Sequence, residues 1–173
     1  MVVHEVCVAA ALLWVLRTRG LDARRLAQRP SGADAVRGVG LAFAVWAAYT
    51  ALWITSALLV PGSTQGLRGA YRVDGPLGFE IVLLVSVVNP IFEEGFVCGY
   101  VLSALTSKVG INAAVAVSVA IRLTYHLYQG PIALLSVIPM GAIHALWYAK
   151  AQRLAPIIIS HAILDFVALV PYS

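Results

Sequence analysis

Two adjacent glutamates in the middle of a long apolar run constrain the fold of this chain more than any other feature. Glu93 and Glu94 lie within residues 79–105, and no basic residue occurs between Glu80 and Lys108. If the run crosses a bilayer, one charged side chain at that depth costs about 2.5–3.5 kcal/mol on insertion scales. An acidic pair in such a position indicates a functional site with polar partners on neighbouring helices.

The composition indicates a membrane protein. Of the 173 residues, 61% are hydrophobic and only 12% are charged, whereas a soluble domain carries about 25% charged residues. The mean hydropathy is +0.88. We predict an all-α fold, a polytopic transmembrane bundle of about six helices around a polar interior cavity, built as one membrane-embedded domain over residues 1–173. The net charge of +4 comes mostly from arginines at 17–37, which indicates orientation in the lipid bilayer and not nucleic-acid binding.

Six apolar segments are the predicted helices, at residues 2–16, 39–60, 79–107, 111–125, 132–149 and 155–170. The first is shorter than the roughly 20 residues that a span needs, so it is a tilted span, an interfacial helix or the remnant of a longer N-terminus. It lacks the positive start and the small-residue cleavage site of a signal peptide, and we expect it to be retained.

The basic loops between these segments predict an orientation. The loops at 17–37, at Lys108, and at Lys150 and Arg153 hold nine of the twelve basic residues. Cytoplasmic loops carry an excess of Lys and Arg. We therefore expect these loops to face the cytoplasm of a multi-pass protein of the plasma membrane.

Pro90 precedes the glutamates by about one helical turn. Because proline has no amide donor, it leaves a carbonyl of the preceding turn without its helical partner and predicts a kink. Such kinks occur in membranes where neighbouring groups or water satisfy the freed carbonyl. Pro90 therefore favours a hydrated pocket beside Glu93.

The polar residues of the last four segments are few, and several are spaced four apart, which places each pair on one helix face. Three helices thus each contribute a polar pair to what should be one interior cavity. His144 has no such partner, and we expect it to be a packing residue. The pairs are Glu94 with Cys98, Arg122 with His126, and His161 with Asp165.

Acids and imidazoles gathered in a desolvated site are the parts of a water-activating hydrolase. A carboxylate there can accept a proton from water near neutral pH, and an imidazole can donate to an oxyanion. His and Glu also suit zinc, but neither helical zinc motif, HExxH nor its inverse, occurs. We therefore favour a site without a metal ion or another cofactor.

Three motifs follow one another in the second half of the chain: Glu93-Glu94 with Gly99, residues 125–130, and His161 with Asp165. Their order and spacing resemble the CPBP family of intramembrane endopeptidases, which contains the type II CAAX prenyl proteases and the bacteriocin self-immunity (Abi) proteins. The family pattern is a double glutamate with an arginine four residues after the second, then FxxxH, then HxxxN or HxxxD. The resemblance covers about residues 79–170.

The resemblance implies peptide-bond hydrolysis in the membrane and a role for each motif residue. Glu93 would activate the water, with Glu94 supporting it. His126 would assist the water or position the substrate, and His161 and Asp165 would stabilise the oxyanion. The implied mechanism depends on glutamate and not on a metal ion.

Two positions depart from the family pattern. Cys98 stands where the family has its arginine, and Arg122 stands where it has the phenylalanine of FxxxH. Because Arg122 precedes His126 by one turn, it can supply the missing cation from the neighbouring helix. The alternative is that the loss of the arginine marks a catalytically inactive member.

Functions other than proteolysis stay open on the sequence. The same fold could bind a partner or a bacteriocin as an immunity protein, or carry protons or ions through Glu93, Glu94 and Asp165. For a protease, the substrate could be a prenylated C-terminal peptide, a small peptide toxin or a segment of a membrane protein. The motifs do not choose among these peptide or protein substrates.

Overall fold

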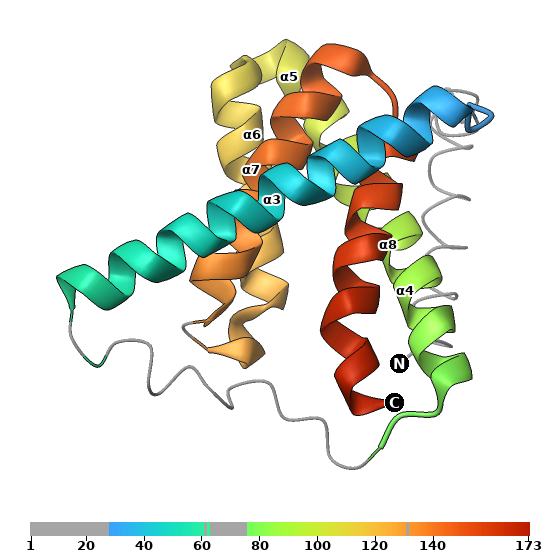
Figure 1. Cartoon of the computed structure of the whole chain (residues 1–173). Helices are drawn as coiled ribbons and strands as arrows, with labels where there is room; N and C mark the ends of the chain where they lie inside the picture. Colours follow the sequence, from blue (N-terminus) through green and yellow to red (C-terminus); the bar gives the residue numbers. More distant parts are fainter. Residues whose placement is uncertain (1–27, 61, 63–75, 131) are drawn as a thin grey trace.

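The computed structural model describes residues 28–60, 62, 76–130 and 132–173, and Figure 1 shows them as a bundle of helices. No strand occurs in these residues, so the all-α prediction is confirmed for them. The rods are α3 (Gly32–Leu59), α4 (Phe79–Glu94) continuing through the π-helix η1 (Gly95–Leu102) into α5 (Ser103–Val109), α6 (Ile111–Tyr125), α7 (Ile132–Ala151) and α8 (Ala155–Leu169). The 3-10 helices η2 (Leu127–Gln129) and η3 (Val170–Tyr172) follow α6 and α8.

The described residues form five helical rods and not the six that were predicted. The first predicted segment, 2–16, lies outside the described residues. Three of the helices are long and apolar enough to cross a membrane: Gly32–Leu59, Phe79–Val109 and Ala155–Tyr172. Their length and composition support a membrane protein.

α3 begins at Gly32, earlier than the predicted start at 39. A capping box fixes this start: the Asp34 amide donates to Ser31 Oγ at 3.3 Å, and the Ser31 amide donates to Asp34 Oδ2 at 2.9 Å. The same buried carboxylate accepts a hydrogen bond from Arg153 Nε at 2.8 Å. Asp34 therefore fastens the start of α3 to the link between α7 and α8.

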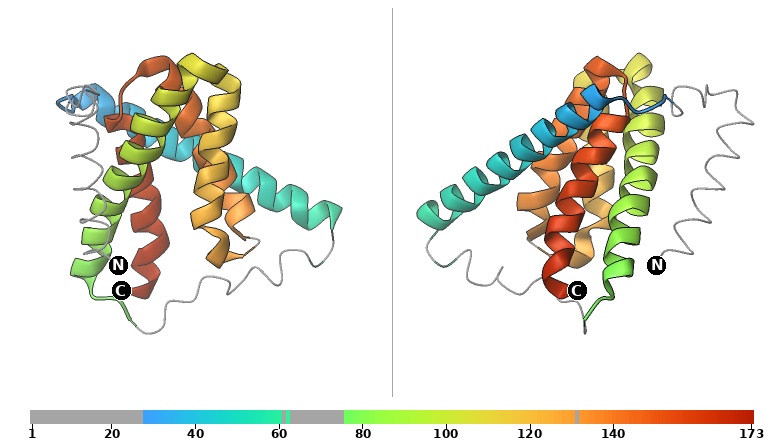
Figure 2. Two further views of the ribbon diagram at one scale, coloured as in Figure 1. Left: turned by 180° about the vertical axis from the view of Figure 1, so that it is seen from behind. Right: turned by 45° about the vertical axis from the view of Figure 1, so that its right-hand side comes forward.

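α3 lies obliquely across the other helices, as Figures 1 and 2 show. Its buried residues all lie in its first half, at intervals of one to four residues: Asp34, Gly38, Leu41, Ala42 and Val45. A Cβ atom on Gly38 would lie 2.7 Å from Ile159 Cγ2 and 3.0 Å from the Pro156 carbonyl oxygen. The close crossing of α3 and α8 therefore requires glycine at this point.

The ends of the rods that carry the predicted basic loops lie on one side of the molecule. In Figure 1 the start of α3, the turn between α5 and α6, and the link between α7 and α8 are all at the top. The turn at Gly110 has a φ of 80°, a left-handed conformation that glycine adopts at little steric cost. Residues 17–27 of the first basic loop lie outside the described residues, so a single basic face stays a prediction.

The rod formed by α4, η1 and α5 changes its helix type directly after the glutamates. α4 continues through Pro90 to Glu94, and the π-helix η1 occupies the next eight residues. The sequence predicts the irregularity at Pro90, whereas the change to π-helix comes about one turn later, at Gly95. π-helical turns are rare and often occur at functional sites.

A compact apolar cluster joins η1 to its neighbours near the basic end. The buried members of the cluster are Leu41, Cys98, Leu102, Ala114, Val115, Ala145, Tyr148, Leu154 and Ile157.

Exposed apolar side chains, among them Phe43, Trp46 and Leu58, cover much of the outer surface, as a lipid-facing bundle requires.

Candidate functional site

The two glutamates end α4 in different surroundings. Neighbouring residues on an α-helix point about 100° apart. Glu94 is wholly buried, whereas Glu93 is 7% exposed. The pair therefore comprises one enclosed carboxylate and one at the edge of the buried region.

Glu94 receives polar groups from three other helices. The guanidinium of Arg122, on α6, donates from Nη2 to Glu94 Oε2 at 2.5 Å. Nδ1 of His144, on α7, and Nδ1 of His161, on α8, lie 3.1 and 2.8 Å from Glu94 Oε1. Both oxygens of Glu94 are thus occupied by groups from α6, α7 and α8.

The imidazole of His161 lies between two carboxylates. Its Nδ1 faces Glu94, and its Nε2 lies 3.4 Å from Asp165 Oδ1. The other oxygen of Asp165 accepts a hydrogen bond from Asn89 Nδ2 at 3.2 Å. Because both ring nitrogens face acceptors, an oxyanion role for His161 requires one of these contacts to open.

Glu93 has its own donors. Tyr125 donates its hydroxyl to Glu93 Oε2 at 2.9 Å. Nη1 of Arg122 lies 3.6 Å from the same oxygen. Arg122 thus lies between the two carboxylates, and Tyr125 orients the less buried one.

His126 lies beside the cluster and not within it. Its Nδ1 is 2.9 Å from the Arg122 carbonyl oxygen, one turn earlier on the chain. Its ring centroid is 4.6 Å from that of Tyr125. The structure therefore brings together five of the six predicted residues, Glu93, Glu94, Arg122, His161 and Asp165, and places His126 next to them through Tyr125.

The side chain of Arg122 contacts Cys98, which stands at the position of the family arginine. Its Nη2 is 3.6 Å from Cys98 Sγ, and the whole side chain is buried. Gly141, on α7, leaves room for it, because a Cβ at that position would lie 3.1 Å from Arg122 Cδ. The cation reaches the glutamates from α6 and not from their own rod.

His144, which the motifs do not include, lies next to Glu94. It is wholly buried, and its Nε2 lies 2.9 Å from Ser160 Oγ while its Nδ1 faces Glu94. His144 is therefore in contact with Glu94, and its expected role as a packing residue stays a prediction. The available signal was its place inside an apolar helix, where a polar side chain is costly without partners.

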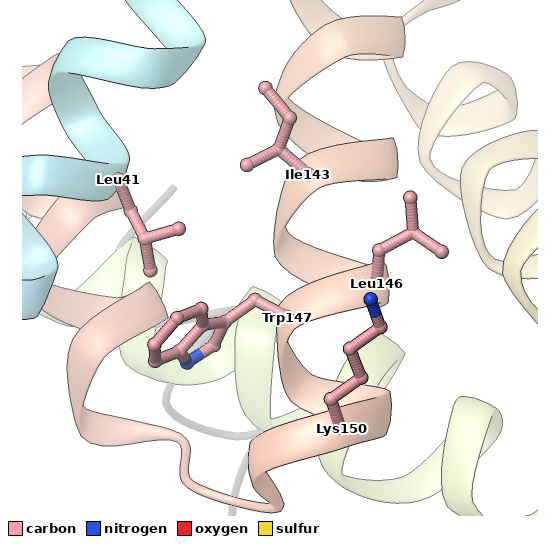
Figure 3. A pocket seen from close by; sticks show the side chains of 5 residues that line it. All are labelled: Leu41, Ile143, Leu146, Trp147 and Lys150. Atoms are coloured by element: carbon pink, nitrogen blue, oxygen red, sulfur yellow. The ribbon is translucent and has the colours of Figure 1, made fainter.

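The predicted polar cavity is not shown. Glu94, Arg122 and His144 are packed directly against one another with no exposed surface. A pocket of about 270 Å³ lies elsewhere, between α3 and α7, where Leu41 faces Ile143, Leu146 and Trp147, with Lys150 at its edge (Figure 3). This pocket is apolar and contains none of the site residues.

Three of the clustered residues offer a set of metal-ligating atoms. One atom each from Glu94, His144 and His161 lie within 4.8 Å of one another. All three side chains are buried. Two imidazoles and a carboxylate are a known ligand set of catalytic zinc.

Comparison with known proteins assigns the family. The profile of the type II CAAX prenyl endopeptidase Rce1-like family matches residues 76–167, more than half of the 173-residue chain. No curated protein and no solved structure gives a match. The matched range contains Glu94 and its partners Arg122, His144 and His161, and the match confirms the resemblance to CAAX proteases. The chain belongs to the Rce1-like family of type II CAAX prenyl endopeptidases, a family of membrane proteases.

Proposed function

We propose that this protein is an intramembrane endopeptidase that hydrolyses a peptide bond with water activated by Glu93. Membership of a protease family supports the reaction class. The observation that carries the proposal is the difference between the two carboxylates. Glu94 is enclosed, with both oxygens occupied, whereas Glu93 lies at the edge of the buried region.

Glu93 has the geometry of a general base. Within the described part of the chain, both of its polar contacts fall on Oε2, so Oε1 is the oxygen that can accept a proton from water. A general base must lie within hydrogen-bond reach of that water. The Tyr125 hydroxyl holds Oε2 and so aims Oε1.

The remaining residues surround this base. Glu94 fixes Arg122 and the two buried imidazoles in place. His126, next to Tyr125, assists the water or positions the substrate. His161 and Asp165 stabilise the oxyanion once the substrate carbonyl displaces one of the contacts of the His161 ring, because a preorganised donor lowers the barrier to a tetrahedral intermediate.

The substrate class follows from the family and the membrane. The family name supports a prenylated C-terminal peptide as the substrate. Five rods with apolar outer surfaces support a multi-pass protein, and we place it in the plasma membrane. A peptide toxin or a membrane-protein segment is the alternative substrate that the following experiment would reveal.

The test is cleavage of quenched fluorescent peptides by the purified protein in detergent. One series ends in a CAAX sequence with and without a farnesyl group, and a second series is a mixed peptide library. We expect cleavage by the wild-type protein and a loss of about 100-fold or more in Glu93→Gln, the usual contribution of a general base. Glu80→Gln is the matched control, because Glu80 lies exposed in the first turn of the same helix.

Two outcomes would contradict the proposal. Equal cleavage by wild-type protein and Glu93→Gln would exclude Glu93 as the base. Folded protein that cleaves no peptide but carries protons in liposomes would favour an ion carrier in place of a protease.

A further inference from the structure

We propose that the apolar pocket between α3 and α7 binds one phospholipid with an anionic headgroup, whose phosphate contacts Lys150. The pocket has a volume of about 270 Å³ and contains none of the residues around Glu94. The inference therefore does not depend on the proposed hydrolysis, and it holds whether or not the protein cleaves peptides.

The wall of the pocket suits a hydrocarbon chain. One apolar side chain, Leu41, comes from α3, and the others come from about one turn of α7 (Figure 3). Those on α7 are Ile143, Leu146 and Trp147. Pockets for small molecules commonly have volumes of about 300–1,000 Å³, so this one has room for part of a single acyl chain.

The rim of the pocket is open to the outside of the bundle. Leu146 is 42% exposed, and Lys150 is exposed as well. In a bundle with an apolar outer surface, lipid chains lie against the helices. An acyl chain can therefore enter the pocket from the bilayer without crossing the protein.

Lys150 places a cation one turn beyond the apolar wall. It follows Leu146 by four residues and Trp147 by three, so the three side chains share one face of α7. Lys150 is one residue before the end of α7, and it forms no salt bridge among the described residues. A lysine at the end of a membrane helix extends its ammonium group toward the lipid headgroups.

α3 contributes a second cation at the same end of the pocket. Arg37 precedes Leu41 by four residues and so lies on the same face of α3. Arg37 and Arg153 both pair with one carboxylate, that of Asp34. Together with Lys150, three cations thus accompany one carboxylate, which leaves two excess positive charges. This excess favours a lipid with a net negative charge over a zwitterionic one.

The test follows quenching of Trp147 fluorescence by brominated lipid. A variant in which the other three tryptophans are changed to phenylalanine reports on Trp147 alone, which lines the pocket. The full chain is placed in phosphatidylcholine vesicles that contain increasing fractions of brominated phosphatidylglycerol, which is anionic, or of brominated phosphatidylcholine, which is zwitterionic. We expect half-maximal quenching at an about fivefold lower fraction of phosphatidylglycerol, the effect of one lysine near an anionic lipid.

Matched variants assign this preference to the pocket. Lys150→Gln should bind the two lipids alike, whereas Lys108→Gln, in the last turn of α5, should keep the preference. Ile143→Phe fills part of the pocket and should require more lipid for half-maximal quenching, whereas Ile138→Phe, exposed on the same helix, should not. A chain that keeps only Trp46, which is 57% exposed and lies outside the pocket, should show no preference.

Four results would overturn the site. Equal quenching of Trp147 by the two lipids would show an ordinary lipid-facing surface. Folded protein without quenching of Trp147 would show that protein, and not lipid, covers the pocket. An unchanged preference in Lys150→Gln would exclude Lys150 as the headgroup contact. Displacement of the brominated lipid by a farnesylated CAAX peptide, but not by the same peptide without the farnesyl group, would assign the pocket to the substrate.

Discussion

Arg122, on α6, donates to Glu94 at the end of α4, with Nη2 2.5 Å from Oε2. Both side chains are wholly buried. The family pattern has its arginine four residues after the second glutamate, where this chain has Cys98. Because Arg122 also lies 3.6 Å from Cys98 Sγ, the cation reaches the glutamates from a neighbouring helix and packs against the residue that replaces the usual one.

Arg122→Ala should abolish peptide cleavage and destabilise the protein. Removing one partner of a buried ion pair leaves the other charge uncompensated, at a cost of about 3–5 kcal/mol. Thermal unfolding in detergent and the peptide assay measure the two effects. Cys98→Ala, which removes a small buried side chain from the same place, should keep its activity.

A double variant makes this prediction stricter. Arg122→Phe combined with Cys98→Arg restores the two residues of the family pattern, and we expect it to recover activity that Arg122→Phe alone lacks. Wild-type activity in both Arg122→Ala and Cys98→Ala would show that the Arg122 guanidinium is dispensable.

Replacing Glu94 should destabilise the protein more than replacing Glu93. Glu94→Gln removes the charge that faces Arg122 and should destabilise the protein by about 3–5 kcal/mol. Glu93→Gln should change stability by about 1 kcal/mol or less, since the glutamine keeps an oxygen for the Tyr125 hydroxyl. Unfolding of the two variants side by side checks the order, and a larger loss for Glu93→Gln would reverse the assigned roles.

Tyr125→Phe should lower kcat/KM by up to about tenfold while the protein stays folded. The change removes one hydrogen bond to Glu93 Oε2, and such a bond contributes about 0.5–1.5 kcal/mol, which is up to about tenfold in rate. Peptide cleavage at low substrate concentration measures the effect. Tyr128→Phe is the control, because that side chain is 82% exposed; an equal loss in both variants would argue against a specific role for Tyr125.

Gly38→Val should loosen α3 from α8. The added side chain meets Ile159 and the Pro156 carbonyl oxygen at or below 3.0 Å, and overpacking of this kind costs about 1–3 kcal/mol. Gly40→Val tests the same substitution on the same helix where a Cβ meets nothing within 4 Å. A lower unfolding temperature is expected for Gly38→Val alone.

The positions of the helices could be predicted because apolar runs and glycine turns report them directly. The predicted segment 111–125 matches α6, and the turn before it lies at Gly110. The start of α3 was the exception. The arginine-rich stretch 17–37 resembles one polar loop, but Ser31 and Asp34 form a capping box inside it, and a cap starts a helix whatever the charge of its neighbours.

The faces of the site could be predicted, but not its contacts. Residues four apart share a face, which groups His161 with Asp165 on α8. Which faces meet depends on helix tilt and rotation, and packing sets these. His144 has no charged residue one turn away on its own helix, so only the fold brings it to Glu94.

In the π-helix η1, hydrogen bonds span five residues and not four, so this stretch between α4 and α5 holds more chain per turn than an α-helix. Deleting one residue from 99–101 would let it relax toward ordinary pitch while Glu94 and α5 keep their places. The same deletion within α4 would turn the residues before it by about 100° relative to the acids and should abolish folding. A deletion scan scored by the yield of folded protein would test this, and we expect η1 to be the stretch of the rod where insertions and deletions survive in evolution.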